Sequence, residues 1–297
     1  MRFQNVIRLS PHTNNEPPAG SPCDRHRGER RYAATPSSCG TPFNRQGNLS
    51  YGSVSYTKYS YPGLYGPQNF HHYPGDCPVP PAAGGADLEG SIADFNDYRQ
   101  VFDCELLGLA DLRTDSDYVR NTLAAYLNKL IGYGVSGFRV DAAKHIGQAD
   151  LAAIAARVHR TLDGTRPYLA LEVFGGGPGV LSPFAFQSLG SLLGLDADVQ
   201  IKNAFKSYNS PPNDGNVGDL RIFGESSGLV PSSHELSFVQ NHDTERNGDA
   251  LNYKDGATNI IANEFLLAYG YGRPEVYASF AWNTTDRVDS RKMRAKR

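Results

Sequence analysis

One short stretch decides the fold of this chain: Gly134-Val135-Ser136-Gly137-Phe138-Arg139-Val140-Asp141-Ala142-Ala143-Lys144-His145. It begins with small and apolar residues and ends in a cluster of ionisable ones. This pattern predicts a buried parallel strand whose carboxyl end opens into a site. In barrels of parallel strands, the chemistry takes place at that end.

Two charged side chains share one face of the predicted strand. Arg139 and Asp141 are two positions apart, so their side chains point to the same side of a strand. A guanidinium group beside a carboxylate favours the ionised form that a nucleophile needs. The alternative is a structural ion pair at a strand end.

Three motifs in order resemble the α-amylase family of glycoside hydrolases. Gly137–His145 resembles the family's fourth-strand motif, and Glu172-Val173-Phe174 and Phe238-Val239-Gln240-Asn241-His242-Asp243 resemble two later ones. The resemblance covers roughly residues 51–282. It implies an α/β fold, a (β/α)8 TIM barrel with a protruding irregular domain B. Strands four to eight are visible in the sequence, so the barrel is expected to be incomplete.

The resemblance also divides the chain into segments. Residues 1–50 are rich in Pro, Arg, Ser, Asn and Gly, and they lack the family's strands one to three and its Asp-x-x-x-Asn-His motif. Such a composition buries little apolar surface. We therefore expect this segment to be disordered, or to result from a gene-model or reading-frame error. Residues 51–110 resemble domain B, 111–282 the C-terminal part of the barrel, and 283–297 form a disordered tail.

Strands and helices are predicted to alternate, as in a parallel α/β protein. Val119, Leu123, Tyr126, Leu127 and Leu130 recur at helical spacing. Asp115 or Ser116 can cap this helix at its start, and Gly132 or Gly134 can end it. The further predicted elements are a helix over 151–162, a strand over 168–173, a helix over 184–193, strands over 199–205 and 236–239, a helix over 260–269 and a last strand over 275–280.

Three carboxylates lie at predicted strand ends: Asp141, Glu172 and Asp243. By resemblance, Asp141 is the nucleophile, Glu172 the general acid and base, and Asp243 the residue that orients the sugar. Retaining hydrolysis needs a nucleophile and a protonated acid about 5–5.5 Å apart. Taken singly, each carboxylate can also be a helix N-cap or a solvated loop residue.

Four residues, Arg139, Lys144, His145 and His242, are expected to bind the substrate by the same resemblance. His242 would hydrogen-bond to sugar hydroxyl groups, and Lys144 and His145 would line a subsite for the leaving group. Arg139 would support the site from the strand. The alternatives are a strand-end histidine with satisfied hydrogen bonds for His242 and a solvated loop for Lys144 and His145.

Two ions follow from the resemblance. The Asp111 side chain and the backbone carbonyl groups of Phe102 and His145 match positions that bind a structural Ca²⁺ in the family, and hard oxygen ligands suit that ion. The family's asparagine ligand has no counterpart in this sequence.

The second ion is a chloride, which one branch of the family binds. Arg139 and Asn241 match two of its three ligands. The third position should be basic but is Glu275, and an acid repels an anion. A chloride site is therefore not expected, and Arg139 and Asn241 would simply support Asp141.

Four cysteines, Cys23, Cys39, Cys77 and Cys104, match no zinc spacing and allow up to two bridges. The resemblance implies a Cys77–Cys104 disulfide; the alternative is a pair of free thiols. The tyrosine-rich segment over 55–63 can stack sugar rings, although a loop tyrosine more often packs against its neighbours.

The charge and hydropathy of the whole chain limit its possible partners. The net charge is −2, which gives no reason to expect a nucleic-acid or membrane surface. No run of 18 apolar residues occurs, and no signal peptide is recognisable at the start. The resemblance implies an extracellular monomer that acts on α-glucans.

Three functions are compatible with these features. The first is retaining endo-hydrolysis of α-1,4-glucosidic bonds. The second is an inactive or α-glucan-binding remnant of an α-amylase, which the missing Asn-His motif favours. The third is a transglycosylase of the same family, in which a sugar replaces water as the acceptor.

Overall fold

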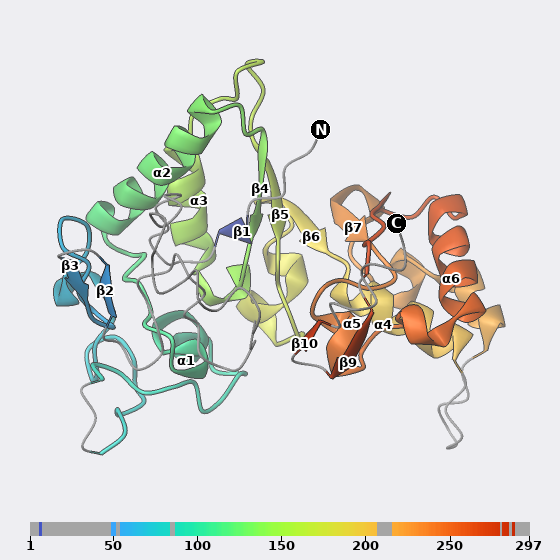
Figure 1. The fold of residues 1–297 in the computed structure, drawn as a ribbon, viewed down its shortest axis with the longest axis horizontal. Coiled ribbons are helices and arrows are strands. Elements are labelled where there is room, and N and C mark those ends of the chain that lie inside the picture. Colours follow the sequence, from blue (N-terminus) through green and yellow to red (C-terminus); the bar gives the residue numbers. More distant parts are fainter. Residues whose placement is uncertain are drawn as a thin grey trace. The chain divides into compact units, whose positions relative to one another are not determined.

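The computed structural model describes residues 6–7, 49–51, 54–83, 87–206, 216–279, 281–284 and 287–288. The chain divides into two compact units (Figure 1). Unit 1 comprises Met1–Leu169 and Gly177–Leu181, and unit 2 comprises Ala170–Gly176 and Ser182–Arg297. Among the described residues, no helix is both long and apolar enough to span a membrane.

Unit 1 contains two helices that pack against each other. The longer one, α2, begins after Ser116, whose side chain accepts the Val119 N–H, and it ends at Gly132, as the sequence predicts. Arg157, at the end of α3, donates to the Asp117 carboxylate at 2.7 Å and so links the two helices. The elements of unit 1 are β1 (Val6–Ile7), β2 (Leu49–Tyr51), β3 (Val54–Tyr56), α1 (Tyr98–Asp103), α2 (Asp117–Gly132), β4 (Gly137–Val140) and α3 (Gln148–Ala156).

Strand β4 is the buried strand that the opening stretch predicts. It pairs in parallel with β1, and the Tyr168 N–H at the start of β5 (Tyr168–Leu171) donates to the Ser136 carbonyl next to β4. Phe138 and Val140 of β4 are buried. At Gly137 a side chain would collide with Tyr168 of the neighbouring strand, so the glycine permits close pairing.

The irregular segment between β3 and α2 is held by aromatic packing and a disulfide. Tyr59, Tyr61 and Tyr65 surround Phe70 with ring centroids 5.3–6.3 Å away, and all four side chains are buried. These tyrosines therefore pack, and do not offer their faces to a sugar. The expected Cys77–Cys104 disulfide is present, whereas Cys23 and Cys39 lie outside the described residues.

Removing this disulfide should destabilise unit 1. The two cysteines are separated by 27 positions, and a cross-link that closes a loop of this length contributes about 2–4 kcal/mol. We expect the variant in which both Cys77 and Cys104 are serine to lose this amount of unfolding free energy in urea denaturation. Reduction of the wild-type protein should give a similar loss, and equal midpoints for variant and wild type would contradict the prediction.

Unit 2 is built on a parallel ladder that runs from the end of β5 through β6 and β7 to β8. Its core lies between α4, α6 and the loops around Phe223 and Leu251. The elements of unit 2 are β6 (Ser191–Leu193), α4 (Leu195–Phe205), β7 (Glu235–Ser237), α5 (Thr244–Asn247), α6 (Ala257–Ala268), β8 (Arg273–Pro274), β9 (Trp282–Thr284) and β10 (Arg287–Val288).

Three element predictions in unit 2 are wrong. The predicted helix over 184–193 contains the strand β6, and the predicted strand over 199–205 lies inside the helix α4. The last strand, predicted over 275–280, lies at Arg273–Pro274. The ladder extends one residue further, because the Glu275 N–H donates to the Ser237 carbonyl at 2.8 Å.

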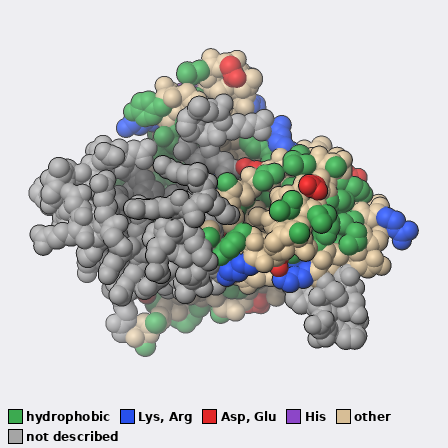
Figure 2. Space-filling view, turned by 45° about the vertical axis from the view of Figure 1, so that its right-hand side comes forward, with side chains coloured by type: hydrophobic (Ala, Val, Ile, Leu, Met, Phe, Trp, Pro, Cys, Tyr) green, Lys and Arg blue, Asp and Glu red, His purple; other side chains and the backbone are tan. Residues whose placement is uncertain are grey.

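Helix α6 also presents apolar side chains to solvent. Ile260, Ile261 and Leu267 are each more than half exposed. Hydrophobic side chains gather on the part of unit 2 that is turned forward in Figure 2. The opposite face of α6, with Ala262 and Leu266, is buried in the core of unit 2.

Candidate active site

The carboxyl end of β4 carries Asp141 on a sharp turn. Val140 ends the strand, and Ala142 adopts a left-handed conformation with φ of 51°, which is unfavourable for a residue with a side chain. The Arg139 guanidinium, whose side chain is almost fully buried, is ion-paired with the Asp141 carboxylate. Asp141 itself is 28% exposed. The turn therefore presents a carboxylate that is accessible on one side and held by a buried cation on the other.

Lys144 and His145 follow on the short 3-10 helix Ala143–His145. Lys144 is buried and His145 half-buried. The His145 ring donates from Nδ1 to the Val101 carbonyl at 3.0 Å, because a carbonyl can only accept. Burial, together with the nearby Lys144 charge, lowers the pKa of His145 to about 4. At neutral pH the ring is therefore uncharged, and its Nε2 is available as an acceptor.

The residues expected to bind calcium lie in unit 1, around α1 and the segment that follows it. Asp111 is the only one of them that supplies a carboxylate. Its Oδ2 atom lies 2.7 Å from Nδ1 of the buried His71. The His71 backbone N–H also donates to the Asp111 carbonyl, at 3.1 Å. One oxygen of the expected ligand is therefore already engaged by a histidine.

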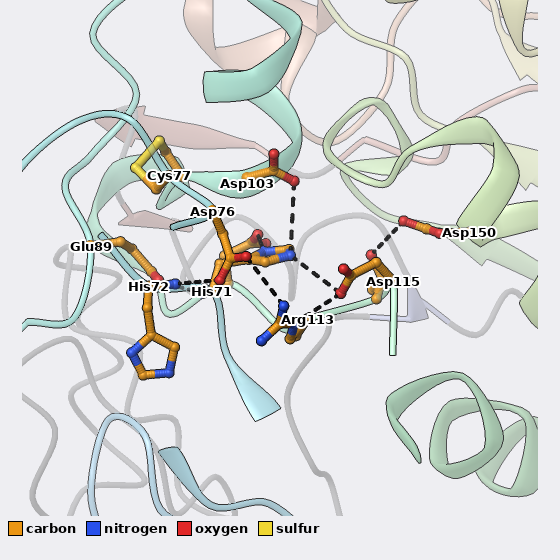
Figure 3. Close-up of polar contacts among 12 residues, drawn as sticks. His71, His72, Asp76, Cys77, Glu89, Asp103, Arg113, Asp115 and Asp150 are labelled. Carbon is orange, nitrogen blue, oxygen red and sulfur yellow. Dashed lines mark hydrogen bonds and ion pairs between the residues drawn. A yellow bond between two sulfur atoms is a disulfide. The ribbon is translucent and has the colours of Figure 1, made fainter. Parts of the chain in front are cut away.

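His71 lies within a group of carboxylates. Its Nε2 is 3.8 Å from both Asp103 and Asp115. Burial lowers the pKa of His71, but the hydrogen bond to Asp111 and the charges of Asp111, Asp103 and Asp76 outweigh it and raise this pKa to about 9. A positively charged imidazole thus occupies the centre of the cluster in Figure 3. Within the described ranges, no group of three or more His, Cys, Asp or Glu side chains is arranged to hold a metal ion. The donor types suit Ca²⁺, but these residues alone do not make its site, and calcium binding stays a prediction.

In unit 2, Glu172 and the Asn241–Asp243 turn both follow parallel strands. Glu172 comes directly after β5 and is half-buried. The turn follows β7, which pairs in parallel with β6, as β5 does. The carboxyl ends of parallel strands meet at one edge of a sheet. The topology of unit 2 therefore places Glu172 and Asp243 at the same edge.

The Asn241–Asp243 turn is fixed by its own side chains. Asn241 Oδ1 accepts the backbone N–H groups of Asp243 and Thr244, at 2.8 and 2.9 Å. His242 Nε2 lies 3.1 Å from Asp243 Oδ2, and the two side chains are 44% and 58% exposed. The turn thus leaves an acid and an imidazole exposed side by side. Groups that bind sugar hydroxyls must be exposed in this way.

The two residues that match chloride ligands of the family lie in different units, Arg139 in unit 1 and Asn241 in unit 2. The Asn241 Nδ2 group is buried and makes no hydrogen bond with a described residue, so it could donate to an anion. Glu275, at the third position, is half-buried and acidic. The expectation that no chloride binds stays a prediction.

Sequence reasoning missed several buried polar groups around these residues. His71 was noted only as part of a pair, and its contact with Asp111 joins residues 40 positions apart. Asp198 on α4 is also fully buried, and neither of its carboxyl oxygens makes a hydrogen bond with a described residue. No spacing rule predicts such a buried acid, because tertiary packing alone covers it.

A buried carboxyl group on β7 predicts pH-dependent stability. Burial, with the nearby Asp196 and Asp198 charges, raises the pKa of Glu235 from 4.5 to about 8. The folded protein then holds a proton that the unfolded chain releases, so this contribution to stability is present below pH 4.5 and is lost as the pH rises towards 8. We expect Glu235→Gln to gain unfolding free energy relative to wild type over this range, by at most about 1.4 kcal/mol per pH unit.

Urea denaturation at several pH values measures this effect. Glu264→Gln provides the matched control, because Glu264 is exposed on α6. The difference between Glu235→Gln and wild type should grow with pH, whereas Glu264→Gln should follow the wild type. Parallel pH curves for all three proteins would show that Glu235 does not titrate in this range.

Comparisons with known proteins relate the chain to α-amylases. No protein-family model matches the chain. It is 40% identical over 237 residues to an α-amylase of Thermomonospora curvata, which covers 79% of this chain and 35% of that protein. It is 37% identical over 238 residues to an α-amylase-related protein of Drosophila melanogaster, which covers 77% of this chain and 44% of that protein.

Solved structures also relate the chain to α-amylases. The crystal structure of α-amylase I from Eisenia fetida superposes with a TM-score of 0.69 at 30% identity, over 80% of this chain and 50% of that one. A mutant of that enzyme, solved in complex with maltohexaose, superposes equally well. An α-amylase from Malbranchea cinnamomea, at 21% identity and a TM-score of 0.55, shares the fold.

Over the matched region, the chain belongs to the α-amylase family. It spans between about a third and a half of the length of these curated relatives.

Proposed function

We propose that the protein is a retaining endo-hydrolase of α-1,4-glucosidic bonds in starch- or glycogen-type polysaccharides. The observation that carries this proposal is the position of three carboxylates, Asp141, Glu172 and Asp243, each after a parallel strand. The kinship with α-amylases supports it. On this proposal strands β4 to β8 are the later strands of a (β/α)8 barrel, the segment that contains Cys77 and Cys104 is its domain B, and the protein acts as an extracellular monomer.

The chemistry divides between two carboxyl groups. Asp141 attacks the anomeric carbon while protonated Glu172 donates its proton to the leaving glycosidic oxygen, which breaks the bond and forms a glycosyl ester on Asp141. Glu172 then takes a proton from water, whose oxygen displaces Asp141, and the product keeps the α configuration.

The remaining residues bind and orient the sugar. Asp243 and His242 would hydrogen-bond to its hydroxyl groups and favour the distorted ring of the transition state. The Arg139 cation stabilises the Asp141 carboxylate before attack and after release. Lys144 and uncharged His145 would line the leaving-group side. A structural Ca²⁺ at Asp111 is part of the proposal, but no step depends on it.

Release of reducing sugar from soluble starch tests this function. We expect wild-type protein to be active and Glu172→Gln to lose nearly all activity, because the amide cannot donate the proton. Glu264→Gln, an exposed change on α6, should match the wild type. Assays with added Ca²⁺ and with a chelator test the calcium expectation in the same experiment.

The alternative functions would give different results in these assays. An α-glucan-binding remnant, favoured by the missing Asn-His motif, would release no sugar but would co-sediment with starch. A transglycosylase would convert maltoheptaose into products longer than the substrate. An inactive remnant would do none of these and would refute the hydrolase proposal.

A further inference from the structure

We propose that Asn247 is a modification site, at which the protein deamidates spontaneously and becomes an isoaspartate or aspartate form. Asn247 is the last residue of the short helix α5, within unit 2 (Figure 1). Together with Gly248 it forms the one Asn-Gly pair in the whole sequence. The pair lies outside the three motifs, and its modification does not depend on the proposed function.

The reaction needs only water. The backbone nitrogen of Gly248 gives up its proton and attacks the side-chain carbonyl carbon (Cγ) of Asn247. A bond forms between these two atoms, the bond from Cγ to Nδ2 breaks, and ammonia leaves after taking up the proton. The product is a five-membered succinimide ring. Water then adds to either carbonyl group of the ring and opens it, which gives isoaspartate or aspartate. No oxidant, reductant or cofactor takes part.

Gly248 favours this reaction because nothing shields its backbone nitrogen. It has no side chain, and its φ of 90° belongs to the left-handed region that glycine adopts readily. Apart from its chain neighbours, no described atom lies within 4 Å of the position that a Cβ atom of this residue would occupy. Asn247 and Gly248 are both exposed. Water therefore reaches the amide, and the backbone has room to move into the ring geometry.

The side chain of Asn247 is folded back along the chain that follows it. Its Oδ1 accepts the Asp249 N–H at 2.8 Å, and its Nδ2 donates to Asp249 Oδ2 at 2.5 Å. Side-chain turns of this kind hold an asparagine amide against the backbone of the next two residues. The amide is therefore kept on the side of the Gly248 nitrogen, from which the attack must come.

Asn252 is a natural comparison in the same stretch of chain. Its Oδ1 accepts the Lys254 N–H at 3.0 Å, so its side chain forms the same kind of turn. The residue that follows it is Tyr253, whose side chain shields the backbone nitrogen and restricts φ. We therefore expect Asn252 to stay intact under conditions in which Asn247 is modified.

The product should disturb the end of α5. A carboxylate at position 247 has no proton to donate to Asp249, and it repels the Asp249 charge at the same contact. Isoaspartate also lengthens the backbone by one carbon atom. The chain after Gly248 cannot readily absorb this atom, because Ala250 and Leu251 are buried. The distortion therefore falls on α5.

Helix α5 connects this position to Asp243. The Asn247 N–H donates to the Asp243 carbonyl at 3.2 Å, and the Ala250 N–H donates to the Thr244 carbonyl at 3.3 Å. Distortion of α5 should therefore displace the turn that presents the Asp243 carboxylate. This consequence for activity rests on the proposed function of Asp243.

Peptide mapping of aged protein tests the proposal without any need for activity. The full chain is incubated in mildly alkaline buffer, and samples are digested with trypsin and analysed by tandem mass spectrometry. Trypsin cleaves after Arg246 and Lys254, and the resulting peptide 247–254 contains both Asn247 and Asn252. We expect Asn247 to be converted several-fold faster than Asn252, with isoaspartate as the main product. A sample digested before incubation corrects for conversion during digestion.

Asn247→Gln is the matched variant. Its longer side chain would have to close a six-membered ring, which forms much more slowly, so the aged variant should keep its mass and its midpoint in urea. The midpoint of the aged wild type should fall as isoaspartate accumulates. If starch is hydrolysed, the kcat of the wild type should decline in step with this modification, whereas the variant should keep its initial rate.

The outcomes separate this proposal from the proposed function. Conversion at Asn247 supports the modification site even if the wild type releases no sugar, a result that would count only against the hydrolase. Equal rates at Asn247 and Asn252 would overturn the proposal. It would also be overturned if Asn247 stayed intact in the folded protein while the free peptide 247–254 deamidated, because the fold would then protect the pair. A constant midpoint during conversion would overturn the predicted effect on α5.

Discussion

Asp141→Asn should reduce starch hydrolysis by about 10⁴-fold or more, the scale of loss seen when a nucleophilic group is removed from an enzyme. The carboxamide has nearly the shape of the carboxylate, and its oxygen can still accept from Arg139, which is ion-paired with Asp141. It cannot form the glycosyl ester. The loss should therefore appear in kcat, measured by reducing-sugar release, while the melting temperature changes little.

Asp150→Asn provides a close control for this prediction. Asp150 is also paired with an arginine, Arg120, and also lies in unit 1, but it follows no strand. Its replacement should leave kcat unchanged. If Asp141 served only as a structural ion pair, the two variants would behave alike, with small losses of stability and normal rates. Such a result would remove Asp141 from the mechanism.

The sequence predicts the part of the fold in which buried residues are apolar. Helix α2 was found because Val119, Leu123, Leu127 and Leu130 form one apolar face, and all four are buried. Strand β4 was found because its apolar run is short and ends in charges. In both elements the local pattern and the tertiary burial agree.

Helix α4 was missed because its buried face contains an acid. Leu195, Asp198 and Ile201 are all buried and recur at helical spacing. With an aspartate in the middle, the apolar residues that remain, Val199 and Ile201, alternate like those of a strand. At this position the local sequence pattern and the tertiary burial disagree, and the helix was therefore mistaken for a strand.

The candidate site, like the fold, was predicted only in part. The residues after strands, such as Asp141 and Glu172, could be found from motifs. Contacts such as that between His71 and Asp111 could not, because these residues meet only through packing of distant segments. The irregular segment of unit 1 contains a third such group around Lys58, which has no periodic pattern.

Lys58→Met should be among the most destabilising single changes in unit 1. Lys58 is paired with Glu105 and, at 2.7 Å, with Asp87. The Tyr59 hydroxyl also donates to Glu105, at 2.5 Å. The side chains of Lys58 and Glu105 are only 11% and 3% exposed. Removal of the cation leaves the Glu105 carboxylate buried without its partner, which costs about 3–5 kcal/mol. Urea denaturation followed by circular dichroism measures the loss.

Two further variants test the cause of this loss. In Lys58→Met/Glu105→Gln the buried charge is gone and the amide oxygen can still accept from Tyr59, so most of the stability should return. Lys206→Met breaks a more exposed pair, with Asp255, and should cost less than about 1 kcal/mol. If the double variant were as unstable as Lys58→Met alone, the packing of the lysine stem would be responsible, and the charge pair would have little net effect. Recovery in the double variant would instead show that the charge of Glu105 makes Lys58 necessary.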